Sequence, residues 1–340
     1  MCSGLGNGGA GSFAIMACGT LEVHWMRYRR LGRSDLEVSV VSLGTWAFGG
    51  VDFGPVDELD ARKTIFRALD FGVNLFDTAP IYGNGRAEEV LGKALEGLRK
   101  DVFLATKCGP VEVRPGLVRL DLSRTGIESQ LDQSLRRLRT DYVDLLQIHW
   151  ADPASPIEEA VGTLMRMVEK GKVRCAGVSN FDLEQMHRAT SSGEVVSLQS
   201  EYSLLEREVE QEVLPFCEEH EIGFLAYSPL AMGLLSGRYD VRRKLAPTDV
   251  RTRDPRFRGR ELELRLERVE QLARLARREG IPTATLAVAW VVSQRGVSSA
   301  IVGAKNPRQL VENLQAADLE LDVETLERAA RTCVLDGARD

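Results

Sequence analysis

The sequence predicts an α/β protein built as a (β/α)8 TIM barrel, with an N-terminal β-hairpin before it and a C-terminal helical extension after it. Eight apolar runs of strand length alternate with segments of helical periodicity, which favours parallel strands joined by helices. Eight such units are the number that closes a barrel, and 340 residues are enough for one barrel with extensions.

The expected elements follow one another along the chain. Residues 28–31 and 36–39 flank a Gly-Arg-Ser-Asp turn and predict the hairpin. The eight strands are expected at 40–43, 73–76, 102–106, 142–148, 173–178, 196–199, 223–226 and 299–302. Helices are expected at 57–71, 86–98, 125–138, 157–170, 183–190, 208–220 and 262–279, with a helical tail at 324–333.

Two further features bear on domain organisation. Residues 237–260 form a long polar stretch containing prolines, and loops of this length are usually functional lids or disordered. A doubly wound two-domain fold is the alternative, but no G-x-G-x-x-G follows the first strand and no linker interrupts the alternation. We expect residues 26–340 to form a single domain. Residues 1–25 are expected to be a disordered leader, or to precede a true start at Met26, and they lack the pattern of a signal peptide.

The composition excludes several classes of protein. Hydrophobic residues at 44% and charged residues at 28% are typical of a soluble globular chain, and a net charge of −6 argues against a nucleic-acid partner. No apolar run approaches the roughly 20 residues of a membrane span. The six cysteines form no C-x-x-C pair, which indicates reduced thiols and a cytoplasmic location. The four histidines lie on separate elements, so no metal site is expected.

Four side chains at expected strand ends suggest chemistry. Asp77 ends the second strand, Tyr82 lies in the following loop, and Lys107 and His149 close the next two strands. Singly, such an acid is more often a helix cap, such a lysine is usually solvated and such a histidine is usually structural. Together they fit one mechanism. Lys107, paired with Asp77, would lower the pKa of the Tyr82 phenol, and His149 would orient a carbonyl. Tyr82 would then protonate the alkoxide as a hydride arrives.

The motifs around these residues resemble those of the aldo-keto reductases, from about residue 27 to residue 322. The matching segments are Asp77 to Tyr82, Ala105-Thr106-Lys107 and Gln147-Ile148-His149-Trp150. The resemblance implies a catalytic tetrad of Asp77, Tyr82, Lys107 and His149. It also implies a substrate pocket formed by Trp46, Tyr82, His149 and Trp150, and it is greatest to the bacterial and potassium-channel β-subunit branch.

The same resemblance implies a nicotinamide cofactor site. Ser179, Asn180 and Gln199 would hold the carboxamide, and Tyr227 would stack on the ring, although Tyr227 alone would be interpreted as a core aromatic. The small residues after Tyr227 would let backbone N–H groups approach the pyrophosphate. Lys305, Arg308 and Gln309, beside a helix start, would provide charge and donors for the 2′-phosphate, although Arg308 could be an ordinary exposed arginine. The preference for NADP(H) rests mainly on Lys305. The full set of expected contacts is Thr45, Trp46, Ser179, Asn180, Gln199, Tyr227, Ser228, Pro229, Leu230, Gly233, Gly303, Lys305, Gln309, Glu312 and Asn313.

The leading hypothesis is therefore an NADP(H)-dependent oxidoreductase that reduces aldehydes or ketones, with a small-molecule carbonyl as its partner. The alternative is a slow-turnover regulatory subunit that binds NADPH and senses redox state, because channel β subunits share the tetrad. A metal-dependent barrel hydrolase is disfavoured by the missing ligands. The sequence predicts neither the particular substrate nor the oligomeric state.

Overall fold

A computed structural model describes residues 26–114, 116–242 and 244–334. Its centre is a closed barrel of eight parallel strands in the order β3-β4-β5-β8-β9-β10-β11-β12, with β12 pairing back to β3. These strands are β3 (Val41–Gly44), β4 (Leu75–Asp77), β5 (Phe103–Cys108), β8 (Val143–Ile148), β9 (Val173–Ser179), β10 (Val195–Glu201), β11 (Gly223–Tyr227) and β12 (Val297–Gly303). The predicted barrel and all eight of its strands are confirmed. The expected leader, residues 1–25, lies outside the described residues.

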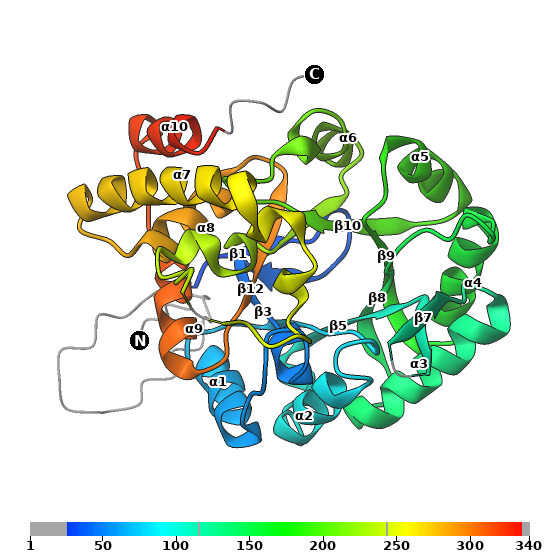
Figure 1. Cartoon of the computed structure of the whole chain (residues 1–340). Helices are drawn as coiled ribbons and strands as arrows, with labels where there is room; N and C mark the ends of the chain where they lie inside the picture. Colours follow the sequence, from blue (N-terminus) through cyan, green and yellow to red (C-terminus); the bar gives the residue numbers. More distant parts are fainter. Residues whose placement is uncertain (1–25, 115, 243, 335–340) are drawn as a thin grey trace, which may run out of the picture.

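Helices surround the barrel (Figure 1). They are α1 (Glu58–Asp70), α2 (Arg86–Ala94), α3 (Arg124–Leu138), α4 (Ile157–Glu169), α5 (Leu183–Ser192), α6 (Val213–Glu219), α7 (Gly259–Arg278), α8 (Thr283–Ser293), α9 (Pro307–Leu314) and α10 (Val323–Thr332). The expected helical tail is α10, which packs against α7 and α8. Short 3-10 turns are η1 (Trp46–Gly49), η2 (Arg99–Asp101), η3 (Glu208–Glu210), η4 (Ala231–Ser236), η5 (Val250–Thr252), η6 (Pro255–Phe257) and η7 (Gln315–Ala317).

The N-terminal hairpin contributes to the barrel interior. Its strands β1 (Tyr28–Arg30) and β2 (Glu37–Ser39) pair antiparallel, as predicted. Leu31, Leu36 and Val38 are buried in one cluster with inward residues of the barrel strands, among them Leu75 and Ala105. Side chains alternate along a strand, so the residue two positions after Leu75 or Ala105 also points inward, one layer nearer the carboxyl end.

Sequence periodicity missed one helix and one hairpin, and it merged two other elements. Helix α8 is buried on all sides and therefore has no polar face to give a helical pattern. The antiparallel hairpin of β6 (Pro110–Arg114) and β7 (Leu117–Leu120) follows the lysine strand and was not expected. The helix expected at 208–220 is divided into η3 and α6. Pro215 in the first turn of α6 explains the break, because proline cannot continue a helix from upstream.

The stretch 237–260 crosses the carboxyl side of the barrel between β11 and α7. Its described residues contain η5 and η6, and α7 begins within it at Gly259. Across the barrel mouth, the Val250 N–H donates to the Asp52 carbonyl oxygen at 2.8 Å. We refer to residues 237–258 as the strap.

Candidate active site

The predicted tetrad gathers at the carboxyl ends of neighbouring strands. Asp77 is the last residue of β4, Lys107 lies in β5 and His149 directly follows β8. Tyr82 lies in the loop between β4 and α2, where its N–H donates to the Ala79 carbonyl at 3.1 Å. The four side chains come from three consecutive units of the barrel and converge because parallel strands end at one edge.

Lys107 is the centre of this cluster. Its ammonium is 2.7 and 2.8 Å from the two carboxylate oxygens of Asp77, 2.9 Å from the Thr78 carbonyl oxygen and 3.3 Å from the Tyr82 phenol oxygen. Only 1% of Lys107 is exposed. The ion pair between Lys107 and Asp77 is thus fully buried. A desolvated pair with complete hydrogen bonding is held in one geometry.

The expectation of a lowered pKa for Tyr82 is wrong for this structure, because the net pKa of the phenol is raised. Burial of the phenol, and then the negative charges of Asp77 and Asp52, raise the pKa of Tyr82 well above its usual value. The ammonium is at hydrogen-bond range but is itself neutralised by Asp77. Tyr82 is therefore firmly protonated, which is the state that a proton donor requires.

His149 is held as a neutral imidazole. Burial, and then the nearby Lys107 charge, lower the pKa of His149 well below its usual value. Its ring stacks on Trp150 with centroids 3.9 Å apart and lies edge-on to Tyr82 at 6.0 Å. Within the described part of the chain, Nδ1 is buried without a hydrogen-bond partner. Because a buried unpaired N–H is costly, this favours the tautomer with its proton on Nε2.

The tetrad opens into a cleft of about 810 Å³. Its wall beside the phenol is aromatic, since Trp46 stacks on Tyr82 at 5.8 Å and meets Phe53 edge-on at 4.8 Å. The Trp46 indole N–H donates to Asp52 at 2.7 Å, which fixes the ring. Trp150 borders the same cleft and is 43% exposed. The four residues expected in the substrate pocket therefore all line this cleft.

Nearly all of the predicted site residues line the cleft. They are Trp46, Asp77, Tyr82, His149, Trp150, Ser179, Asn180, Gln199, Tyr227, Ser228, Pro229, Leu230, Gly233, Gly303, Lys305, Gln309, Glu312 and Asn313. Lys107 and Thr45 are buried and do not line it. Instead of reaching the cleft, the Thr45 hydroxyl donates to the backbone carbonyl of Asp77 at 3.0 Å.

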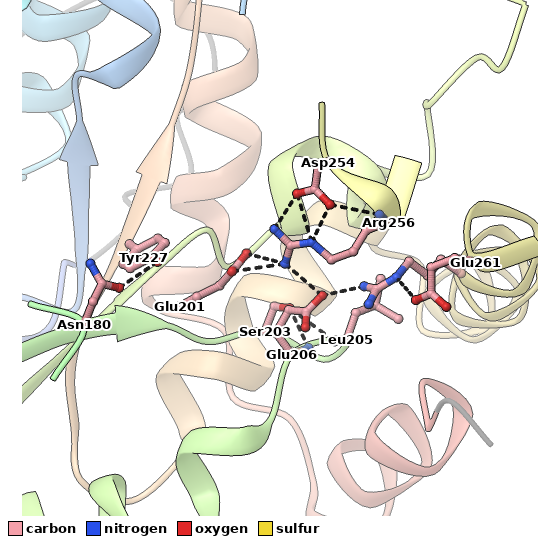
Figure 2. Close-up of polar contacts among 10 residues, drawn as sticks. Asn180, Glu201, Ser203, Leu205, Glu206, Tyr227, Asp254, Arg256 and Glu261 are labelled. Atoms are coloured by element: carbon pink, nitrogen blue, oxygen red, sulfur yellow. Dashed lines mark hydrogen bonds and ion pairs between the residues drawn. The ribbon is translucent and has the colours of Figure 1, made fainter. Parts of the chain in front are cut away.

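The expected carboxamide-binding residues form a network of amides. Asn180, in a left-handed conformation with φ of 59°, donates through Nδ2 to the His149 carbonyl at 3.0 Å and to Ser179 Oγ at 3.1 Å. Its Oδ1 accepts from the Tyr227 hydroxyl at 2.9 Å, as Figure 2 shows. Gln199 donates through Nε2 to Asp77 at 2.9 Å. These amides therefore connect the cleft to the tetrad.

One end of the cleft combines a left-handed turn with Lys305. Ser228, Ala231, Met232 and Gly233 all have positive φ, between 45° and 99°. Left-handed residues close to one another can turn backbone N–H groups toward one side. In this turn the Ala231 N–H donates to the Ser228 carbonyl at 2.8 Å and the Gly233 N–H donates to the Leu230 carbonyl at 2.9 Å. Lys305 lies at the mouth, where its ammonium donates to the Phe53 carbonyl.

Arg238, which sequence analysis missed, lines the same end and pairs with Glu312. The only sign of Arg238 in the sequence was its positive charge, directly after Gly237 in the long polar stretch. Phe53, Tyr239 and Arg251 also border the cleft and were missed. They come from loops, whose paths depend on tertiary contacts that local patterns do not encode.

An ion network anchors the end of the strap (Figure 2). Arg256, in η6, lies 3.1 Å from Glu201 at the end of β10, 3.1 Å from Glu206 and 2.7 Å from Asp254. Arg265 of α7 continues the network by pairing with Glu206 and Glu261. The strap thus has a strong anchor on the barrel at one end.

Two other features are absent from the described residues, a membrane-spanning helix and a metal-binding cluster. No helix in that part of the chain is long and apolar enough to cross a membrane. No group of three or more His, Cys, Asp or Glu side chains among residues 26–114, 116–242 and 244–334 is arranged to hold a metal ion.

Comparison with known proteins agrees with this class of barrel. Residues 40–331 match the model of the aldo/keto reductase family. Over 288 residues the chain is 40% identical to the aldo-keto reductase YhdN of Bacillus subtilis, an alignment that covers 84% of this chain and 87% of that protein. It is 35% identical to an NADH-specific methylglyoxal reductase of Escherichia coli, with 86% and 93% covered.

A plant protein and a solved bacterial structure are also similar to this chain. A probable voltage-gated potassium channel subunit beta of Arabidopsis thaliana is 37% identical, with 86% of this chain and 92% of that protein covered. The solved structure of a glycerol dehydrogenase from Gluconobacter oxydans superposes with a TM-score of 0.82 at 34% identity, covering 92% and 95% of the two chains. The fold is that of the barrel oxidoreductases to which this chain is similar. The chain belongs to the aldo/keto reductase family.

Proposed function

We propose that this protein reduces aldehydes or ketones to alcohols with NADP(H), and that Tyr82 is the general acid. The observation that carries the proposal is the buried cluster in which the Lys107 ammonium lies between Asp77 and the Tyr82 hydroxyl, 3.3 Å from the phenol oxygen. Tyr82 and His149 both face the cleft. Two donors directed at one carbonyl oxygen provide the stabilisation that a developing alkoxide needs.

The reaction requires each side chain to act in a particular protonation state. Neutral His149 would donate an Nε2–H hydrogen bond to the substrate oxygen and orient the carbonyl. Tyr82 would give its proton to that oxygen as negative charge develops. Lys107 would stabilise the resulting phenolate, and Asp77 would keep Lys107 in place. The aromatic wall of Trp46 and Phe53 would exclude water from the reacting carbon.

The cleft suits a nicotinamide dinucleotide. Side-chain amide groups lie at the end next to the tetrad, and the turn that contains Ser228, Leu230 and Gly233 also lines the cleft. Ser179, Asn180 and Gln199 would hold the carboxamide, Tyr227 would pack on the ring, and Ser228, Leu230 and Gly233 would approach the pyrophosphate. When bound in its reduced form, the cofactor supplies the hydride.

The choice of NADP(H) rests on the positive charges at the cleft mouth. Lys305 and Arg238 both border this end, where the adenosine half would lie, and Gln309 adds an amide. A 2′-phosphate is a dianion that such cations compensate. The relative from Escherichia coli is described as NADH-specific, so the phosphate preference of this chain needs its own measurement.

Single-turnover kinetics test the proposal. Protein loaded with stoichiometric NADPH, and separately with NADH, is mixed with a panel of aldehydes and ketones while the cofactor absorbance is followed. We expect rapid oxidation of bound NADPH by at least one aldehyde, followed by repeated turnover when NADPH is in excess. Tight binding with only slow oxidation would instead favour the regulatory-subunit alternative. No oxidation by any carbonyl would contradict the proposal.

A further inference from the structure

Glu88 is a fully buried carboxylate that the proposed reaction leaves unassigned. It lies in the first turn of α2 and is 0% exposed. One of its oxygens accepts from the Thr106 hydroxyl at 2.7 Å, and the other accepts from Arg137 Nε at 2.6 Å. A buried charge is tolerated only when it is paired and hydrogen-bonded, so these two partners define its position closely.

Two hydrogen bonds connect Glu88 and its neighbour Ala87 to the tetrad. Thr106 directly precedes Lys107 in β5. Ala87, the neighbour of Glu88, donates its N–H to the carbonyl of Tyr82 at 3.3 Å. Glu88 therefore joins the segment that carries the phenol to the strand that carries the ammonium. Arg137 adds α3 to the same junction.

We infer that Glu88 is a positioning residue for the Tyr82–Lys107 pair, and that it acts in two ways. Its hydrogen bonds set the separation of the phenol oxygen from the ammonium nitrogen, and its negative charge stabilises the ammonium. The inference rests on the proposed reduction at Tyr82. The separation of 3.3 Å is at the long end for a hydrogen bond, so a further displacement would weaken the interaction steeply.

The proposed effect of the Glu88 charge on the Lys107 ammonium agrees with the electrostatics of the lysine. Burial lowers the pKa of Lys107, whereas the charges of Asp77 and then Glu88 raise it. The other charged or titratable groups around the Tyr82–Lys107 pair are Asp52, His149 and Tyr227, with Arg137 behind Glu88. Removing the negative charge of Glu88 would therefore lower the pKa of Lys107 further.

The central test is Glu88→Gln in the full-length protein, which keeps the shape of the side chain and removes its charge. We expect kcat for carbonyl reduction to fall roughly tenfold or more, because small misplacements near reacting atoms are costly. The KM for the carbonyl and the affinity for NADPH should stay close to wild type. The alkaline limb of the kcat profile should move to lower pH by about half a unit to one unit.

Two further variants separate position from charge. Thr106→Val removes the hydrogen bond between β5 and α2 without changing any charge, so kcat should fall while the alkaline limb stays in place. Glu96→Gln is the matched control. Glu96 follows α2 and pairs with Arg139 at 2.7 Å, but its side chain is 68% exposed. Its replacement should change neither kcat nor the pH profile.

The outcomes distinguish this inference from the proposed function. If the wild type reduces a carbonyl and Glu88→Gln matches it in both kcat and pH profile, the inference is wrong. If Glu88→Gln unfolds, an unchanged kcat in folded Thr106→Val would overturn the positioning role. If the wild type reduces no carbonyl at all, the proposed function fails, and this inference fails with it.

Discussion

At the scale of single residues, Lys107 and Asp77 have unequal roles. Lys107→Met removes the only cation within reach of the Tyr82 phenol among the described residues and leaves Asp77 buried without a counterion. We expect carbonyl reduction to become undetectable. Asp77→Asn keeps the ammonium and loses only part of its orientation, so the loss should be smaller. Steady-state kinetics with cofactor titration would compare them. A larger loss in folded Asp77→Asn than in folded Lys107→Met would contradict these roles.

Lys305 is the residue that tests the cofactor preference. A charge-assisted hydrogen bond to phosphate is worth about 1.5–3 kcal/mol, so Lys305→Ala should weaken NADPH roughly ten- to a hundredfold. Its contact with the Phe53 carbonyl would serve either cofactor. The informative quantity is therefore the factor by which Lys305→Ala weakens NADPH binding, divided by the factor for NADH binding. This ratio should shrink as salt rises.

Fluorescence titration of both cofactors would measure that ratio. Arg308→Ala is the control, because Arg308 is exposed and does not line the cleft. Equal weakening of NADH and NADPH in Lys305→Ala would mean that Lys305 only supports the loop. Recognition of a 2′-phosphate would then depend on other residues at the cleft mouth, with Arg238 the first to examine.

At the scale of elements, the strap depends on Arg256. Arg256→Met leaves Glu201, Glu206 and Asp254 close together without their shared cation. Breaking a partly buried network costs several kcal/mol at most, so we expect a lower melting temperature and faster release of cofactor. Arg260→Met is the control, since Arg260 is exposed and pairs with surface residues of its own helix. Unchanged cofactor release in Arg256→Met would show that the strap does not need this anchor.

The sequence predicted the elements whose patterns are local. The strands before Asp77, Lys107 and His149 were found because apolar runs end at polar residues, and strand ends of a parallel barrel share one edge. Helix α8 was missed because it is apolar on every face. The positions of Arg238 and Arg256 depend on the path of the strap, and the raised pKa of Tyr82 depends on burial and on Asp52. These tertiary properties have no signature in a local pattern.

At the scale of the whole molecule, the buried neutral His149 links stability to pH. Folding lowers the pKa of His149 well below its ordinary value of 6.5. Below pH 6.5 the unfolded chain therefore binds a proton that the folded protein does not. This group should therefore make the free energy of unfolding fall as pH decreases, with a slope approaching about 1.4 kcal/mol per unit. Urea unfolding between pH 7.5 and pH 5, compared with His149→Asn, would measure its share. Equal slopes in the two proteins would contradict a buried neutral imidazole.

The proposed reduction depends on Tyr82 as the proton donor, and Tyr82→Phe tests this role most directly. The substitution removes one oxygen and keeps the ring that stacks on Trp46. Stopped-flow single-turnover oxidation of bound NADPH by the best aldehyde is the measurement, with NADPH affinity as the control. General acid catalysis contributes about 10²–10⁴-fold, so we predict at least a hundredfold slower oxidation with little change in affinity. A rate near that of the wild type, with NADPH bound normally, would show that another group donates the proton.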